Sequence, residues 1–172
     1  KMMISSIAYL PADDARRETL PTRAEKRLDQ LVVMIDDVLS LSRIKSSAPI
    51  GEVKVLDVVA ETRAALDTYL EEAKVKGIAL VVEVPDTAVR IRLDTTGYEL
   101  VLSNLLSNAL KYTESGAVTL KLYAANGWAV TEVHDTGMGI PEADIDALFS
   151  EFFRASNARK SGIEGSGVGL TG

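Results

Sequence analysis

The chain has 172 residues, of which 47% are hydrophobic and 26% charged, so it holds enough apolar material for a folded core. Its formal net charge of −6 at pH 7 disfavours a DNA or RNA partner, because nucleic-acid affinity rests on clustered Lys and Arg. The sequence contains no cysteine, which excludes disulfides and thiolate metal sites. It also has no run of about 20 apolar residues that could cross a bilayer. We therefore expect a folded, cytoplasmic segment that makes no membrane contact.

The first segment, residues 1–47, carries the pattern of a helical hairpin. Residues 2–10 are expected to end one helix and residues 11–14 to form the turn. Within residues 24–44, apolar side chains recur at the three- and four-residue spacing of a single helical stripe. The stripe consists of Leu28, Leu31, Val32, Ile35, Val38 and Leu39. Such a stripe needs a partner surface, so the sequence predicts packing against further helices.

A change of composition toward linker residues at 46–51 marks a domain boundary, and a second domain is expected over residues 52–172. Val53 and Val55 alternate as in a short strand. Asp57 is expected to cap a helix that runs to about Lys76, with Gly77 in the left-handed position that ends it.

Four further strands and one helix are expected beyond Gly77. Residues 78–84 and 89–93 read as strands on either side of the Pro85-Asp86 turn. Asp94 is expected to cap the next helix, and residues 117–124 and 128–134 to form a hairpin through Asn126-Gly127. Together these elements predict an α+β fold, an α/β sandwich in which helices cover one face of a mixed sheet.

Three polar side chains share one face of the helix expected after Asp94. Asn104, Asn108 and Lys111 lie at positions i, i+4 and i+7 of the segment Asn-Leu-Leu-Ser-Asn-Ala-Leu-Lys-Tyr. Neutral amide oxygens can bind Mg²⁺ while phosphates and waters complete its octahedral shell. Lys111 would then supply positive charge to the phosphates. Taken alone, the segment is equally compatible with a solvated polar stripe.

A second segment, Asp-Thr-Gly-Met-Gly-Ile, begins at Asp135, where the last predicted strand ends. Gly137 and Gly139 give a backbone that can approach a ligand closely. An ionised carboxylate only accepts hydrogen bonds, which suits recognition of an amino group. Taken alone, an ordinary Asp-Thr-Gly turn is the simpler interpretation.

Two segments near the C-terminal end complete the set. Phe149, Phe152 and Phe153 precede Arg154, and aromatic residues in such a run most often belong to a core. The other segment is Gly165-Ser-Gly-Val-Gly-Leu170. Alternating glycines ahead of an apolar residue are typical of a loop whose backbone wraps phosphates before a helix begins. A flexible glycine-rich tail is the alternative.

The order and spacing of these four segments resemble the N, G1, F and G2 boxes of the sensor histidine kinase ATP-binding domain, in the superfamily shared with gyrase, Hsp90 and MutL. The resemblance implies ATP and Mg²⁺ as ligands, with Asn104 and Asn108 at the metal and Asp135 accepting from the adenine amino group. It also implies a mobile lid at residues 155–164, anchored by the segment with Phe149, Phe152 and Phe153, and a phosphate or phosphoacceptor contact by Arg154. The implied nucleotide-binding residues are Asn104, Asn108, Lys111, Tyr112, Asp135, Gly137, Gly139, Ile140, Gly165, Ser166, Gly167, Val168, Gly169 and Leu170.

Residues 34–44 resemble the second helix of the family's dimerisation and histidine-phosphotransfer hairpin. This implies a homodimer through the hairpin, which forms a four-helix bundle, and a response-regulator receiver domain as a partner. The family's phosphoacceptor histidine is not found on the first helix. The single histidine of the sequence, His134, directly precedes Asp135, where a local structural role is favoured. We therefore expect part of a longer kinase, unable to phosphorylate itself.

The residue at position 104 separates this chain from ATP-hydrolysing relatives. Gyrase-like and Hsp90-like members carry a glutamate there that activates water, whereas Asn104 has an amide without useful basicity. The predicted function is therefore transfer of the ATP γ-phosphoryl group to a histidine outside this chain, and from there to a response-regulator aspartate. Two alternatives remain open: an ATPase clamp of the same superfamily, and a dimeric pseudokinase scaffold that uses nucleotide as a structural ligand.

Overall fold

The computed structural model describes residues 24, 27–28, 35, 51–163 and 165–170. Of the predicted N-terminal hairpin this includes four residues, Ala24, Arg27, Leu28 and Ile35, and all four are helical. Leu28 and Ile35 belong to the predicted apolar stripe and are 60% and 58% exposed. The predicted turn, the rest of the hairpin and its pairing lie outside the described residues.

Within the described residues, five strands form two hydrogen-bonded sheets. Strand β1 (Val53–Asp57) pairs antiparallel with β3 (Arg90–Asp94). In the other sheet, β4 (Ala117–Ala125) lies between β2 (Ala79–Glu83), to which it is parallel, and β5 (Trp128–Asp135), to which it is antiparallel. The sequence predicted these strands, but the two on either side of Pro85-Asp86 belong to different sheets.

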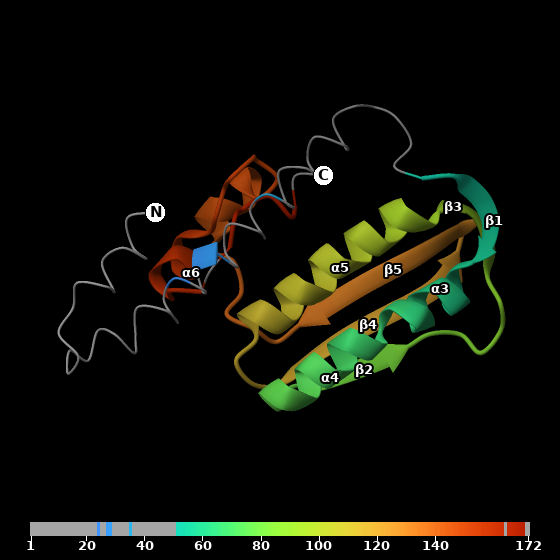
Figure 1. Ribbon diagram of the computed structural model, residues 1–172, viewed down its shortest axis with the longest axis horizontal. Helices are drawn as coiled ribbons and strands as arrows, with labels where there is room; N and C mark the ends of the chain where they lie inside the picture. The colour runs from blue at the N-terminus through green and yellow to red at the C-terminus, as the bar shows by residue number, and fades with distance from the viewer. Residues whose placement is uncertain (1–23, 25–26, 29–34, 36–50, 164, 171–172) are drawn as a thin grey trace.

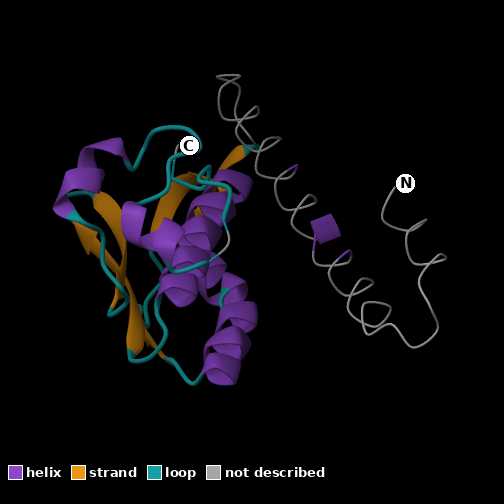
Figure 2. Cartoon of the chain, turned by 90° about the vertical axis from the view of Figure 1, so that its left-hand side faces the viewer, coloured by secondary structure: helices purple, strands orange, loops and turns teal. Residues whose placement is uncertain are grey.

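Three helices cover one face of the strands: α3 (Val58–Ala65), α4 (Asp67–Lys76) and α5 (Thr95–Tyr112) (Figures 1 and 2). Side chains alternate along β4, so Val118, Leu120 and Leu122 point toward the helices and are buried. They meet the buried side of α5, which contributes Leu102, Leu106, Ala109 and Leu110. The mixed sheet with helices on one face confirms the predicted α+β sandwich.

The single helix predicted from Asp57 to Lys76 is wrong, because the helix is interrupted at Leu66. The Leu66 amide donates to the Arg63 carbonyl three residues earlier (3.2 Å), which tightens the last turn of α3. The Leu66 side chain is only 3% exposed and packs with Leu102 and Leu106 in the main core. Val58 and Val59 at the start of α3 belong to a separate cluster with Leu122. The two helices therefore serve different parts of the core.

Two aspartates each cap a helix and hold a second segment in place. The Asp57 Oδ1 atom accepts from the amides of Val59 (3.1 Å) and Val89 (2.9 Å). The Asp94 carboxylate accepts from the amides of Gly97 (3.1 Å) and Gly51 (2.7 Å). These contacts confirm both predicted N-caps. They also fasten the β1–β3 sheet to the starts of α3 and α5.

Two turns follow the predicted chemistry. Gly77 ends α4 with a φ of 70°, the left-handed conformation expected of it. Asn126 and Gly127 have φ values of 52° and 82°, as a two-residue type I′ hairpin turn requires, and they join β4 to β5.

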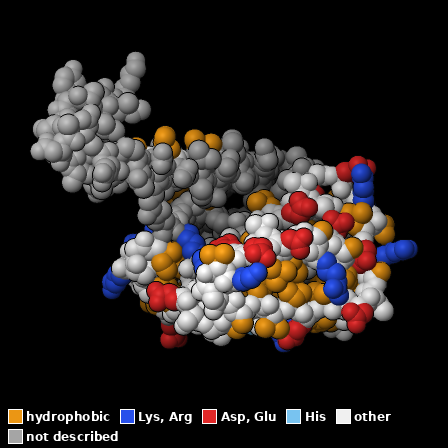
Figure 3. Space-filling model, turned by 60° about the horizontal axis from the view of Figure 1, so that its bottom comes forward, with side chains coloured by type: hydrophobic (Ala, Val, Ile, Leu, Met, Phe, Trp, Pro, Cys, Tyr) orange, Lys and Arg blue, Asp and Glu red, His pale blue; other side chains and the backbone are white. Residues whose placement is uncertain are grey.

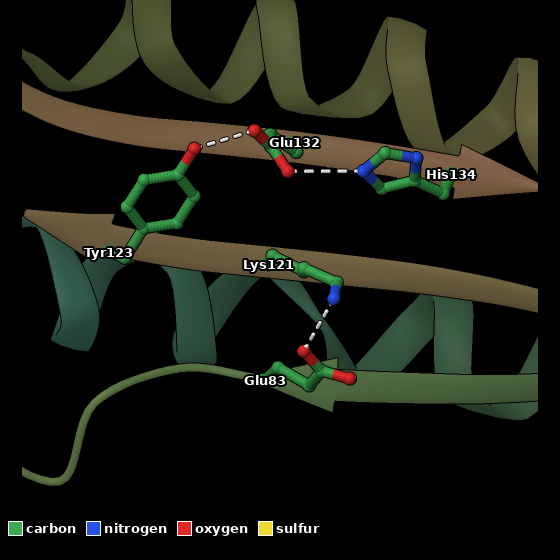
Figure 4. A network of polar contacts seen from close by, with 5 residues as sticks. All are labelled: Glu83, Lys121, Tyr123, Glu132 and His134. Carbon is green, nitrogen blue, oxygen red and sulfur yellow. Dashed lines mark hydrogen bonds and ion pairs between the residues drawn. The ribbon is translucent and has the colours of Figure 1, made fainter. Parts of the chain in front are cut away.

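The other face of the three-stranded sheet carries a polar network (Figure 4). The Tyr123 hydroxyl donates to Glu132 Oε1 (2.6 Å), and Glu132 Oε2 lies 3.1 Å from His134 Nε2. Lys121 pairs with Glu83 across the neighbouring strands at 3.0 Å. His134 thus has a local partner on the face away from the helices, in agreement with a structural role. Charges of both signs also lie among apolar side chains on the surface in Figure 3.

Candidate functional site

Helix α5 and strand β5 both end at the same end of the molecule, close to the short helix α6 (Ser156–Lys160) (Figure 1). The Met138 amide donates to the carbonyl oxygen of Tyr112, the last residue of α5 (3.2 Å). The Thr136 amide donates to the carbonyl oxygen of Ala117 at the start of β4 (3.1 Å). The turn after β5 is therefore fixed against both the helix and the sheet.

Asp135 is exposed at this junction, and its carboxylate is only partly engaged. Its Oδ1 atom accepts from the Gly137 amide (2.9 Å). Because side chains alternate along a strand, Asp135 lies on the same face as Val133, which packs against the core, and opposite to His134. Within the described part of the chain, Asp135 Oδ2 accepts no hydrogen bond, so it can receive one from a ligand donor.

The structure brings the polar stripe of α5 together with the glycine-rich segment. Asn104, Asn108 and Lys111 are all half-buried on one side of the helix. A Cβ atom on Gly169 would lie 3.3 Å from Asn104 Oδ1 and 3.8 Å from Asn108 Nδ2. The backbone of Gly169 therefore lies directly over the two amides.

The same arrangement recurs one turn further along α5. The Lys111 ammonium lies 5.4 Å from the centroid of the Tyr112 ring, within cation–π range. A Cβ atom on Gly165 would lie 2.8 Å from Lys111 Nζ and 3.5 Å from the Tyr112 hydroxyl. The loop backbone at positions 165 and 169 thus lies close to the side chains predicted to meet phosphates and metal.

The middle of the glycine-rich segment packs against the Phe-rich segment. Gly167 has a φ of 77°, and a Cβ atom there would lie 2.5 Å from the carbonyl oxygen of Phe153. Val168 is 6% exposed, and its amide donates to the Ser166 hydroxyl (3.4 Å). Leu170 is half-buried. In the structure this segment therefore packs against the Phe-rich segment, while its predicted role in wrapping phosphates stays a prediction.

Residues 155–163, the described part of the lid predicted over residues 155–164, contain α6 and are tied to two earlier segments. The Ser156 amide donates to Asp144 Oδ2 (2.7 Å), a residue of the short 3₁₀ helix η1 (Glu142–Ala147). Asn157 Nδ2 donates to the carbonyl oxygen of Gly139 (2.9 Å), which has a φ of 64°. Sequence reasoning missed α6, Asp144 and Asn157. An Asp followed by Ser-Asn within about a dozen residues is too common to single out.

The charge of Asp144 is stabilised where it stands. The hydrogen bond from the Ser156 backbone amide holds the pKa of the Asp144 carboxyl below its ordinary value, with help from the Ser156 side chain and from the positive charges of Arg159 and Lys160. Asp144 therefore remains a carboxylate, and an acceptor, throughout the neutral pH range.

Two residues of the Phe-rich segment depart from expectation. Phe149 and Phe152 are 72% and 53% exposed, so the expectation that they belong to the core is wrong. Phe152 has a φ of 58°, which turns the chain sharply before Arg154. The Arg154 Nη2 atom donates to the carbonyl oxygens of Ala158 (3.4 Å) and Ile163. Its predicted phosphate contact stays a prediction, while the observed contacts brace the lid segment.

The donor set fits a magnesium ion that is shared with phosphates rather than one held by protein alone. Among the described residues, no group of three or more His, Cys, Asp or Glu side chains could hold a metal. Asn104 and Asn108 supply neutral amide groups beside a glycine backbone. Mg²⁺ is commonly held by few protein groups and completed by substrate phosphates and water. Ile140, the remaining predicted contact, is 48% exposed in the turn after Gly139.

Comparison with known proteins shows which family this region of the chain resembles. Residues 93–172 match the family described as histidine kinase-, DNA gyrase B-, and HSP90-like ATPase, and this range contains every site residue named above. Sensor histidine kinase YcbM of Bacillus subtilis is 30% identical over 164 residues, which cover 92% of this chain and 51% of YcbM. The chain carries a histidine kinase catalytic domain.

Two further relatives show how far this domain's similarity extends. Two-component system protein A of Emericella nidulans is 32% identical over 149 residues, which cover 82% of this chain and 22% of that protein. The crystal structure of full-length ShkA in complex with AMPPNP has a TM-score of 0.72 and 25% identity, and the match covers 96% of this chain and 34% of ShkA. This chain therefore spans about half the length of YcbM and less of the other two. No helix in its described part is long and apolar enough to span a membrane.

Proposed function

We propose that residues 52–172 bind Mg²⁺·ATP at the junction of α5, β5 and the glycine-rich loop. In the intact protein this domain would transfer the γ-phosphoryl group to a histidine, which then passes it to an aspartate of a response-regulator receiver domain. The observation that carries this proposal is the convergence of Asp135, the amides of Asn104 and Asn108, and the Gly165–Gly169 backbone at one end of the fold. The similar protein ShkA was crystallised with the ATP analogue AMPPNP.

Each part of the proposed site has a separate task. Asp135 Oδ2 accepts from the adenine amino group while Oδ1 keeps its bond to Gly137. Lys111 and the loop amides between Gly165 and Gly169 stabilise phosphate charge. Asn104 and Asn108 hold Mg²⁺, which neutralises charge on the transferring phosphoryl group.

The side chains of α5 favour a kinase over the ATPase clamp. The helix has one acidic residue, Glu99, which lines a surface hollow with Tyr69 and Ser103 on the side facing α4. The stripe that faces the glycine-rich loop carries amides and a lysine instead. A water molecule would therefore find no carboxylate base on α5 at the proposed phosphate site, and hydrolysis should be slow.

The partners belong to the same proposal. Residues 1–47 would form the dimerisation hairpin, and its exposed Leu28 and Ile35 are the described part of the apolar stripe that a second subunit would cover. We expect the reaction to take place in the cytoplasm. Because the predicted phosphoacceptor histidine is not found in this sequence, we expect the chain alone to incorporate no phosphate.

Nucleotide competition tests this function. A fluorescent adenine nucleotide is bound to the purified chain in the presence of Mg²⁺ and is then displaced with ATP or GTP. ATP should displace it much more effectively. Adenine has an amino group that can donate a hydrogen bond to Asp135, whereas GTP has a carbonyl oxygen at that position and cannot donate one. Equal displacement by both would overturn the assigned role of Asp135. Steady phosphate release over many turnovers would favour the ATPase clamp.

A further inference from the structure

The lid segment, residues 155–163, is attached to the rest of the domain at both of its ends. At its start, Asp144 and Gly139 accept hydrogen bonds from Ser156 and Asn157 (2.7 and 2.9 Å). Further along, Arg154 donates to the carbonyl oxygens of Ala158 and Ile163. The start of the lid is thus held by side-chain contacts that cross between elements.

Asp144 and Asn157 are well suited to hold a short helix in one orientation. The residue before α6 is Ala155, whose side chain cannot cap the helix. Asp144 caps it instead, by accepting from the Ser156 amide, which lies in the first turn of α6. Asn157 uses both ends of its amide, because Oδ1 accepts from the Ala158 amide (2.9 Å) while Nδ2 donates to Gly139. Rotation of the Asn157 side chain would break both bonds at once.

These contacts connect the two ends of the proposed nucleotide site. Gly139 lies in the turn that begins at Asp135, the residue assigned to the adenine ring. The glycine-rich loop that follows the lid segment lies over Asn104 and beside Lys111, the residues assigned to metal and phosphate. The orientation of α6 therefore determines how the chain passes from the adenine end of the site to its phosphate end.

We propose that Asp144 and Asn157 are positioning residues that latch the lid segment to the turn after Asp135 and thereby raise nucleotide affinity and slow nucleotide release. The inference rests on the proposed function, because the latch matters for binding only if the site takes ATP. Neither residue touches the nucleotide itself. Both act by limiting the population of open lid from which a ligand escapes.

Trypsin reports the latch directly and without nucleotide. Arg159 and Lys160 lie in α6 and are exposed, so local opening of the lid makes their peptide bonds cleavable. When opening and closing are fast, the cleavage rate follows the population of the open form. Asn157→Asp removes the donor to Gly139 but keeps the acceptor, and Asp144→Ala removes the acceptor of Ser156. We expect each change to speed cleavage after Arg159 and Lys160 about three- to tenfold, the effect of one lost hydrogen bond.

Two matched variants separate this role from general destabilisation. Asp146→Asn changes an exposed carboxylate in the same 3₁₀ helix, for which no partner is seen in the described chain, and should leave cleavage unchanged. Asp144→Asn keeps an oxygen that can accept from Ser156, so it should restore most of the protection lost in Asp144→Ala. All variants should unfold at temperatures close to that of the wild type.

The same variants are then titrated with AMPPNP and Mg²⁺. Asp144→Ala and Asn157→Asp should weaken affinity about three- to tenfold through faster dissociation, and Asp144→Asn should recover most of it. Unchanged trypsin cleavage in both variants would overturn the latch, even if AMPPNP binds well. Faster cleavage with unchanged AMPPNP affinity would overturn the positioning role. Failure of the wild type to bind AMPPNP would overturn both the proposed function and this role, while the cleavage data alone would still decide whether the lid is latched.

Discussion

The carbonyl oxygen of Tyr112 lies 2.4 Å from the position that a Cβ atom on Gly137 would occupy. Real Cβ atoms do not approach a carbonyl oxygen so closely, so only glycine allows the turn after β5 to rest on the end of α5. That contact holds the turn that follows Asp135 against Tyr112, the last residue of α5. The geometry of the adenine end of the proposed site therefore depends on Gly137, which has no side chain.

Gly137→Ala should weaken AMPPNP binding strongly while leaving most of the fold intact. The new methyl group would clash with backbone rather than with a flexible side chain, so the turn must move and carry Asp135 with it. Gly97→Ala is the matched control, because a Cβ atom there meets only the Asp94 side chain, at 3.5 Å or more. Isothermal titration of both variants checks the prediction. Equal affinities would show that the Gly137 contact does not position the site.

Asn108→Ala should reduce the Mg²⁺-dependent part of AMPPNP affinity by about tenfold or more, on the scale of losing a group that supports a bound metal. Ser107→Ala removes a neighbouring exposed side chain that only donates to the Asn104 carbonyl (3.3 Å), and should have little effect. The measurement is an AMPPNP titration at several Mg²⁺ concentrations. A variant with an unchanged Mg²⁺ dependence would remove Asn108 from the metal site.

Leu106→Ala should lower the free energy of unfolding by about 2 to 5 kcal/mol, because it leaves a cavity in a close-packed core. Leu106, on the side of α5 that faces β4, is 0% exposed, whereas Val101 on the same helix is 56% exposed. Val101→Ala should therefore cost much less. Urea denaturation of both variants gives the comparison, and similar losses would contradict the assigned core.

The pKa of Glu132, on the sheet face away from the helices, can be tested by substitution. The Tyr123 hydroxyl, with His134 as a second hydrogen-bond partner, holds the pKa of the Glu132 carboxyl below its ordinary value. This contribution to stability is present above the unfolded-state pKa of Glu132 and is lost as pH falls through the lower folded-state pKa. Tyr123→Phe should raise the Glu132 pKa in an NMR titration. Tyr69→Phe, on α4, should not, and an unchanged pKa in Tyr123→Phe would contradict the assigned cause.

Local signals in the sequence predicted the elements better than their arrangement. The caps at Asp57 and Asp94 and the Asn126-Gly127 turn depend on residues close in sequence, and each is confirmed. The break at Leu66 arises because this side chain joins a core built by distant elements. The division into two sheets likewise depends on pairings between distant strands, which strand pattern alone does not specify.

The candidate site divides in the same way. Asn104, Asn108 and Lys111 were predicted to share a face because helical spacing fixes it, and the glycines near them were found as a motif. The approach of Gly165 and Gly169 to these side chains depends on tertiary packing, which the sequence motifs do not specify. Asp144 and Asn157 escaped prediction because their partners, Ser156 and Gly139, lie 12 and 18 residues away in sequence.

The most direct test of the account is calorimetric titration of the chain with AMPPNP, with and without Mg²⁺, for the wild type and for Asp135→Asn. We predict saturable binding that is strengthened by Mg²⁺ and weakened about tenfold or more by the substitution, the scale expected for a hydrogen bond to a charged group. Glu114→Gln, at an exposed position just after α5, should bind like the wild type. A folded wild-type chain that binds no AMPPNP, or an Asp135→Asn variant that binds it equally well, would contradict the assignment of this site to ATP.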